Sequence, residues 1–290
     1  MTPRMTPLRR KMIRELEVQR KRPNTVNSYV TAVADLGMYY RKSPHKISRD
    51  EIRAYLHYLL TDRKLADSTC NVKIAAIGFF YREVLGQSNF RLKVPSKRPG
   101  KLPEPLSREE VTRLLTAAKN QKHRVLLMAD YSTGLRVSEL VHLKPIHIHS
   151  ERMLVRVDQG KGNKDRYTLL SERLLEELRS YWRAYQPGEW LFPRGDRSGP
   201  MPRGTAQKIF YSVKARAGLK RGAGIHCLRH SFATHLLEAG TSLPTIQRLL
   251  GHRSITTTMK YLHVTVKDLG EVKSPFDLLR LPDSDEQFGD

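Results

Sequence analysis

The chain has 290 residues, enough for two domains with separate cores, and carries 52 Lys and Arg against 29 Asp and Glu, a formal net charge of +23. This excess favours a polyanionic partner, because each neutralised phosphate releases condensed counterions, but a structural RNA-binding protein would show it too. The sequence has no apolar run of 18 residues to span a bilayer and no signal peptide, and its two cysteines provide no disulfide framework. We therefore expect a cytoplasmic protein with no membrane partner.

The N-terminal segment predicts a small helical domain over residues 1–88. Its first helix is basic, and a second begins at Pro23, with apolar residues at helical spacing as far as Tyr40. Ser48 and Glu51 form a capping box that predicts the start of a third helix. Asp67 is expected to cap a fourth. The aromatic side chains of this domain fit a core better than a base-stacking surface.

Residues 89–105 predict a basic, proline-rich linker. Prolines at this density disfavour a helix and stiffen the chain toward an extended form. Two interpretations stay open. The segment could be a solvated linker, or it could be a strap that lies along phosphates between two domains on opposite sides of a duplex.

Residues 106–273 predict a second domain of the α+β class, so the protein as a whole is expected to be mainly α. A capping box at Ser107 and Glu110 opens it, and a helix ends at Thr133-Gly134 before the chain restarts. The segments MLVRVD and RYTLL read as strands flanking a hairpin tip, QGKGNKD, which predicts a small antiparallel sheet. Helices resume at Ser171. The acidic tail, residues 274–290, could dock on a neighbouring protomer or have no fixed structure.

Several residues in this second domain could carry chemistry, although each has an ordinary structural interpretation. Arg136 follows the helix break three residues before Glu139, a pairing often found in buried ion pairs. Lys161 lies in the glycine-rich hairpin, where a solvated lysine is the default; the spacing is not that of a Walker phosphate loop. None of these alone indicates a reaction.

The segment HCLRH is more informative, since helical spacing places His226, Arg229 and His230 on one face. A guanidinium beside a histidine repels a metal cation and suits an anion such as phosphate, which Arg can hold with two hydrogen bonds. His252 follows the end of a helix, and Tyr261 comes nine residues later in what we expect to be a new helix.

The remaining motifs offer little support for other chemistries. His142, His147 and His149 lie close together but lack a cysteine or carboxylate at zinc-site spacing, so no metal is predicted. Neither GxSxG nor HExxH occurs, and no pair of acidic motifs suggests a two-metal nuclease. Cys227 is expected to be a packed thiol.

Taken in order, TGLR-x-SEL, GKGNKDR, H-x-L-R-H-S-F-A-T-H, LLGH and Tyr261 closely resemble the tyrosine recombinases, which include phage integrases, Xer proteins and integron integrases. The intervals of 23 residues from Arg229 to His252 and 9 to Tyr261 are usual for the Xer and integron type. The resemblance covers nearly the whole chain, including the helical first domain. It implies that Glu139 and His230 support a catalytic set. The members of that set are Arg136, Lys161, His226, Arg229, His252 and Tyr261. Cys227 stands where many relatives have Asp.

The resemblance implies a site-specific recombinase or integrase that cleaves and rejoins DNA through a 3′-phosphotyrosyl intermediate. Tyr261 would be the nucleophile, Arg136 and Arg229 would stabilise the phosphate, and Lys161 would protonate the leaving 5′-oxygen. His226 would act as general base, and His252 would donate a hydrogen bond to the phosphate. No metal, ATP or other cofactor is expected. Exchange between two duplexes implies a tetramer on double-stranded DNA.

Two other functions remain open at this point. A type IB topoisomerase would use the same chemistry to relax supercoils, and a non-catalytic protein of this fold would only bind DNA. Among recombinases, the motifs are compatible with integration, excision, transposition as a mobile element, and dimer resolution.

Overall fold

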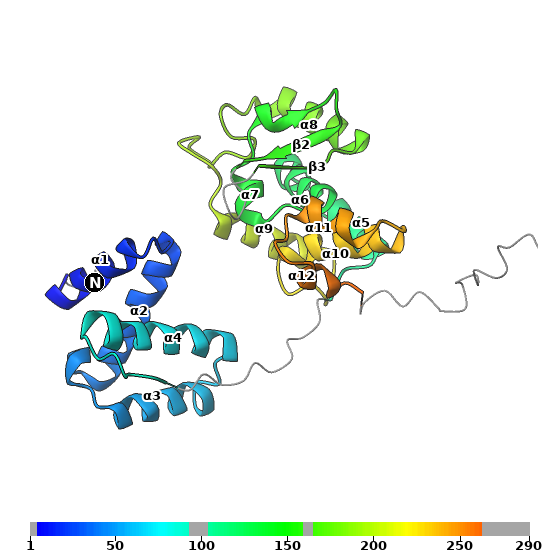
Figure 1. The fold of residues 1–290 in the computed structure, drawn as a ribbon. Coiled ribbons are helices and arrows are strands. Elements are labelled where there is room, and N and C mark those ends of the chain that lie inside the picture. The colour runs from blue at the N-terminus through cyan, green and yellow to red at the C-terminus, as the bar shows by residue number, and fades with distance from the viewer. Residues whose placement is uncertain (1–4, 93–103, 159–164, 263–290) are drawn as a thin grey trace, which may run out of the picture. The chain divides into compact units, whose positions relative to one another are not determined.

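The computed structural model describes residues 5–92, 104–158 and 165–262. The chain divides into two compact units, residues 1–101 and 102–290, each with a hydrophobic core of its own (Figure 1). Within the described ranges, no helix is both long enough and apolar enough to cross a membrane.

The first unit is helical. It contains α1 (Pro7–Val18), α2 (Pro23–Tyr40), η1 (Pro44–Lys46), α3 (Arg49–Thr61), α4 (Asp67–Phe79) and η2 (Phe80–Val84), a π-helical turn. α2 packs against α4, and buried residues of α1, α3 and η2 complete the core that these two helices form between them.

The capping box that predicted the start of α3 is confirmed: Ser48 Oγ accepts from the Glu51 amide, and Glu51 accepts from the Ser48 amide at 2.8 Å. The prediction that Asp67 caps α4 is wrong by one residue. Ala66 is the N-cap, since its carbonyl accepts the amides of Thr69 and Cys70, and Asp67 already lies in the first turn.

The second unit combines helices with a small sheet, as the sequence predicted. Its elements are α5 (Arg108–Thr116), α6 (Gln121–Thr133), α7 (Val137–Val141), η3 (Pro145–His147), β1 (Ile148–His149), β2 (Leu154–Val157), β3 (Arg166–Leu169), α8 (Glu172–Tyr185), α9 (Arg203–Arg216), α10 (His226–Glu238), α11 (Leu243–Leu250) and α12 (Ile255–Met259). The sheet is antiparallel in the order β1-β2-β3. The two-residue strand β1 is too short to leave an alternating pattern in the sequence, and it was not predicted.

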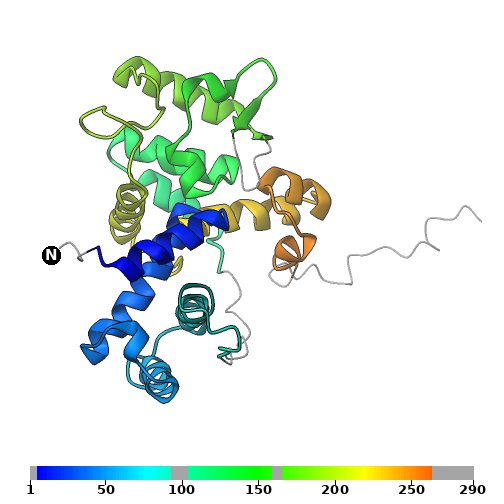
Figure 2. The ribbon, with the colours of Figure 1, turned by 60° about the vertical axis from the view of Figure 1, so that its left-hand side comes forward.

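α6 lies at the centre of this unit. It packs against α10 and α8, and its buried face contributes Val125, Leu126 and Leu127 to the core. It ends at Thr133, where Gly134 adopts a φ of +59°. Figures 1 and 2 show α11 and α12, in orange, beside α10, and α11 also contacts β3. The C-terminal ends of α6 and α11, the first turn of α10 and the start of β3 therefore meet in one region.

Candidate active site

Arg229 is a buried arginine in the first turn of α10, and 5% of its surface is exposed. Nη1 donates to the carbonyl of Gly134, and Nη2 donates to the carbonyl of Leu250 at 2.7 Å. Both carbonyls lie at helix ends, where the helix offers them no partner of its own. Burial lowers the pKa of Arg229 to about 10, and the charge of Arg136 contributes. Because that value is still above neutral pH, a charged guanidinium joins the ends of α6 and α11.

Gly134 makes the turn from α6 to α7 possible. Its φ of +59° is in the left-handed region that favours glycine, and a Cβ there would lie 2.6 Å from Cε1 of Phe232. The turn delivers Arg136 to the N-cap of α7, where the Arg136 amide donates to Glu139 Oε2 at 2.8 Å. The tight turn thus brings Arg136 to the side of the unit where Arg229 lies.

The side chain of Arg136 is held from two directions. Nη1 donates to Glu139 Oε1 at 2.8 Å, and Nη2 donates to the carbonyl of Gly251 at 3.0 Å. Burial alone would raise the pKa of Glu139, but hydrogen bonds and charges from Arg166 and Arg136 outweigh it and lower the pKa to about 2. Glu139 is therefore an ionised carboxylate that fixes the arginine.

His252 follows α11 and contacts Arg229 directly. Its Nε2 lies 3.1 Å from Arg229 Nη2, and its Nδ1 lies 2.9 Å from the Thr258 hydroxyl. Burial and then the Arg229 charge lower the pKa of His252 to about 4, so the ring is neutral at pH 7. A guanidinium can only donate, so we assign Nε2 as the acceptor and Nδ1 as the protonated nitrogen. In this arrangement His252 accepts from Arg229, and its Nε2 can donate to a phosphate only after that bond breaks and Nε2 gains a proton, by a change of tautomer or by protonation of the ring.

Tyr261 lies just past α12 and not within a helix, so the expectation of a helical Tyr261 is wrong. α12 ends at Met259, and the Tyr261 amide continues with a tighter bond to the carbonyl of Thr258 at 3.0 Å. The Tyr261 side chain is buried, with 2% exposure, and its hydroxyl lies 3.0 Å from Nδ1 of His230. Burial raises the pKa of Tyr261, although Arg229 and Arg136 pull it down.

Two histidines of α10 were predicted to serve the site, and only one of them contacts the candidate nucleophile. His230, predicted only to support the site, is the ring within hydrogen-bond distance of Tyr261, and burial lowers its pKa to about 4. His226, predicted as general base, starts the helix with an exposed side chain. Partial desolvation lowers the pKa of His226, and the charges of Arg229 and Arg136 add to the effect. Both rings are thus neutral bases at pH 7.

Lys161, predicted as general acid, lies outside the described residues. The structure instead draws attention to Arg166, which the sequence analysis did not select. Arg166 donates to both carboxylate oxygens of Glu139, at 3.0 and 2.8 Å. The signal for it was present, because Arg166 is the last residue of GKGNKDR.

Two further titratable groups are buried nearby in the second unit. Burial raises the pKa of the Cys227 thiol to about 12, which makes this side chain a packed thiol and not a nucleophile. Asp130 on α6 is 1% exposed, and neither carboxyl oxygen has a hydrogen-bond partner in the described part of the chain. Burial raises the pKa of Asp130 well above its ordinary value, so we treat it as a neutral acid.

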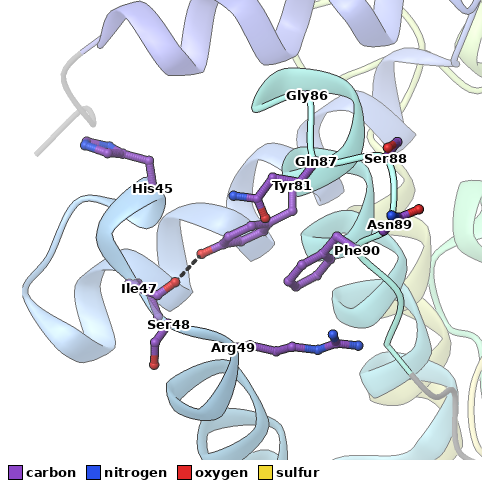
Figure 3. A pocket seen from close by; sticks show the side chains of 10 residues that line it. All are labelled: His45, Ile47, Ser48, Arg49, Tyr81, Gly86, Gln87, Ser88, Asn89 and Phe90. Atoms are coloured by element: carbon purple, nitrogen blue, oxygen red, sulfur yellow. Dashed lines mark hydrogen bonds between the residues drawn. The ribbon is translucent and has the colours of Figure 1, made fainter.

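The first unit contains a pocket of about 480 Å³, lined only by residues of that unit (Figure 3). Tyr81 lines this pocket. Its hydroxyl donates to the carbonyl of Ile47 at 2.9 Å, and its ring stacks on Phe90, with ring centroids 4.4 Å apart. The Arg49 guanidinium covers the other face of this aromatic pair, 5.8 Å from the Phe90 centroid. None of the predicted catalytic residues lines this pocket, so the candidate chemistry belongs to the second unit.

The arrangement in the second unit suits an anion. Arg136, Arg166 and Arg229 lie close enough to influence one another, and Glu139 neutralises one of the three charges. The remaining charge can bind and stabilise a phosphate whose negative charge grows during a reaction. Within the described ranges, no group of three or more His, Cys, Asp or Glu side chains could hold a metal ion.

Comparisons with known proteins identify the family of the chain. Residues 104–268 match the model of the phage integrase family, and residues 8–89 match the N-terminal SAM-like domain of phage integrases. A putative integrase/recombinase of Sinorhizobium fredii, y4qK, is 43% identical over 281 residues, which cover 96% of this chain and 91% of the relative. The tyrosine recombinase XerD of Rhizobium meliloti is 33% identical over 275 residues, 86% of this chain and 88% of that protein.

The fold also matches a solved structure. A crystal structure of the XerH site-specific recombinase in a post-cleavage complex with its palindromic difH substrate superposes with a TM-score of 0.68. The likeness covers 87% of this chain and 80% of that one at 22% identity, and so speaks for the fold. By its sequence, its fold and the residues that its second unit brings together, this chain belongs to the phage integrase family of tyrosine recombinases, the site-specific enzymes that break and rejoin DNA.

Proposed function

We propose that Tyr261 is the nucleophile of this recombinase and that it attacks a DNA phosphodiester within the site formed by Arg136, Arg229 and His252. One observation carries the proposal. Arg229 joins the ends of α6 and α11 and contacts His252, while Tyr261 lies against the next residue of the same helix, His230. These contacts support the proposal that Arg229, His252 and Tyr261 act on one phosphate.

The reaction exchanges one phosphoester bond for another. The Tyr261 oxygen forms a bond to phosphorus, and the bond from phosphorus to the 5′-oxygen breaks, which leaves a 3′-phosphotyrosyl linkage and a free 5′-hydroxyl. The Tyr261 proton passes to a histidine of α10, and Lys161 supplies the proton of the leaving oxygen. Because the new linkage is itself a phosphodiester, a different 5′-hydroxyl can reverse the step without ATP.

The two candidate bases take successive roles in this scheme. His230 holds the Tyr261 hydroxyl in the arrangement described above. His226 accepts the proton once the hydroxyl has moved to the phosphate, since its side chain is exposed and since partial desolvation, with the charges of Arg229 and Arg136, lowers its pKa and keeps the ring neutral. Arg136 and Arg229 neutralise the charge that concentrates on the non-bridging oxygens, and His252 completes the hydrogen bonding of the phosphate.

The rest of the chain supports binding to double-stranded DNA. Residues 1–88 would contact one side of the duplex and residues 106–273 the other, joined by the basic segment 89–105, and residues 274–290 would reach a neighbouring protomer. The net charge of +23 and the DNA-bound state of the XerH relative favour this scheme. Exchange between two duplexes requires four active sites, so the proposal includes a tetramer on DNA. The proposed location is the cytoplasm, since the two cysteines are both free and suit a reducing compartment.

The nucleophile is tested by trapping the covalent intermediate. The substrate carries a nick close to the scissile phosphate. Cleavage then frees a short fragment that carries the new 5′-hydroxyl, and rejoining is prevented once this fragment has diffused away. We expect the wild-type protein to form an adduct in the presence of EDTA, and Tyr261→Phe to form none while its affinity for DNA stays within about twofold, because only a hydroxyl is removed. An adduct of the Phe variant, mapped to Tyr167 or Tyr211, would overturn the assignment, and loss of the wild-type adduct on chelation would refute a metal-free mechanism.

The clamp is tested with a fragment that starts at Leu106. This fragment keeps the complete second core, so we expect it to fold, and it should bind a full site more weakly than the whole chain. The slope of log affinity against log salt should also be shallower, by about one for each phosphate that the first unit neutralises in the whole chain. Equal affinity and equal slope would contradict the clamp and would favour a protein partner for the first unit.

A further inference from the structure

Arg166 is a nearly buried arginine with three hydrogen bonds to other parts of the second unit. Its side chain is 11% exposed. Nη1 and Nη2 donate to the two oxygens of Glu139, and Nε donates to the carbonyl of Leu249 at 3.1 Å. These bonds occupy three of the five N–H groups of the planar guanidinium, in a geometry that a lysine could not reproduce. The Arg166 side chain is therefore fixed in place by other parts of the second unit.

The contacts of Arg166 join three segments that carry candidate catalytic residues. Glu139 ties it to Arg136, and the Leu249 carbonyl ties it to the end of α11, just before His252. Arg166 also begins β3, the strand that follows the segment containing Lys161. The packing is close, because a Cβ on Gly251 would lie 2.7 Å from Cδ of Arg166.

The sharing of Glu139 has an electrostatic consequence. One carboxylate receives two guanidinium groups, at 2.8 Å from Arg136 Nη1 and at 2.8 Å from Arg166 Nη2. A partly buried carboxylate that faced Arg136 alone would neutralise it, and little charge would remain for a phosphate. With Arg166 as a second partner, the cluster keeps a net positive charge and Arg136 keeps unused N–H donors.

We propose that Arg166 is a positioning residue for strand cleavage: it takes up the charge of Glu139, so that Arg136 stays available to the scissile phosphate, and it fixes the turn that carries His252. The proposal rests on the catalytic set proposed above. It assigns to Arg166 no contact with DNA, and it predicts a defect in the chemical step and not in binding.

The test compares Arg166→Gln with Arg156→Gln on a bound, nicked site in single-turnover cleavage. Arg156 is a matched control, because it lies on the neighbouring strand β2, its side chain is 43% exposed, and it pairs with Asp158 and Asp165 at the surface. Both variants lose one positive charge from the same sheet, so their affinities for DNA should agree within about threefold. Arg166→Gln should cleave about 100-fold more slowly than the wild type, the loss typical of removing one group that stabilises a developing oxyanion.

A second substrate separates positioning from a general loss of structure. Replacing one non-bridging oxygen of the scissile phosphate by a methyl group removes its negative charge, and with it most of the demand on Arg136. On this methylphosphonate the deficit of Arg166→Gln relative to the wild type should shrink to less than about 10-fold. Arg166→Lys keeps the charge but loses the fork, so it should fall between Arg166→Gln and the wild type on the phosphate. Tryptophan fluorescence shows whether Arg166→Gln folds. If it does not fold, Arg166→Lys is compared with the wild type on both substrates in its place.

Equal deficits on the two substrates would overturn the proposal, and so would a cleavage rate of Arg166→Gln no lower than that of Arg156→Gln. Tyr261→Phe is measured in parallel. If that variant still forms the adduct, the proposed nucleophile is wrong, a failure recognisable independently of the Arg166 result.

Discussion

The turn at Gly134 gives a quantitative test of how the second unit holds its site. Gly134→Ala should be destabilising for two separable reasons. The φ of +59° places a non-glycine residue in the left-handed region, which costs roughly 1–2 kcal/mol. The added Cβ would also lie against the Phe232 ring, 2.6 Å from Cε1, and overpacking of this kind costs about 1–3 kcal/mol. The sum predicts a loss of roughly 2–5 kcal/mol in the free energy of unfolding.

Gly240 provides the control, because its φ is +86° and a Cβ there would meet no atom within 4 Å. Gly240→Ala should therefore show only the backbone part, roughly 1–2 kcal/mol. Urea unfolding followed by tryptophan fluorescence is suited to this comparison, since Trp182 and Trp190, the two tryptophans of the chain, both lie in the second unit. The signal then reports on that unit alone.

The steric part can be isolated with a double-mutant cycle. Phe232→Leu should destabilise the wild type by opening a cavity, yet it should cost less in the Gly134→Ala background, where it relieves the overlap. We expect a coupling of about 1 kcal/mol or more between the two substitutions. Equal losses for Gly134→Ala and Gly240→Ala, or strict additivity in the cycle, would refute the reasoning.

Two further predictions concern the histidines. His226→Ala should slow cleavage by about 100-fold, as expected for loss of a general base. His230→Ala should cleave no more slowly than the wild type, and at up to about 10 times its rate, because it removes a hydrogen bond worth roughly 1.4 kcal/mol that must break before the hydroxyl reaches phosphorus. His230→Asn, with an acceptor near the position of Nδ1, should return the rate to that of the wild type; a His230→Ala variant slower than His226→Ala would reverse the assignment. The pKa values of His230 and His252, both about 4, lie below the ordinary value of 6.5, so the unfolded chain binds more protons between those limits. The stability of the second unit should therefore fall as the pH drops from about 6.5 toward 4, and a urea midpoint that is the same at pH 7.5 and pH 5 would contradict this.

The sequence predicted what depends on local chemistry. Capping boxes, the Gly134 break and the alternation in LVRV are read from neighbouring residues, and the structure has each of them at the predicted place. The recombinase motifs likewise indicated the family before any geometry was known. Such features depend on a few neighbouring residues and form in the same way whatever the rest of the fold is.

What the sequence did not predict depends on contacts between distant segments. Arg166 receives its role from Glu139, 27 residues earlier, and from Leu249, 83 residues later. The proximity of His230 to Tyr261 spans 31 residues, and no local pattern distinguishes His230 from His226 as its partner. The burial of Asp130 was equally hidden, since an aspartate near the end of a helix is ordinarily solvated.

The concealment of Tyr261 bears on fidelity. A protein with a net charge of +23 spends much of its time on unrelated DNA, where a permanently exposed nucleophile would nick strands at random. If Tyr261 is the nucleophile, as proposed, its hydroxyl must leave His230 and its buried position before it can reach phosphorus. Every 1.4 kcal/mol that this movement requires, and that only the correct site supplies, gives about a tenfold preference for cutting there. Selectivity for the recombination site can therefore be exerted after binding, at the release of one side chain.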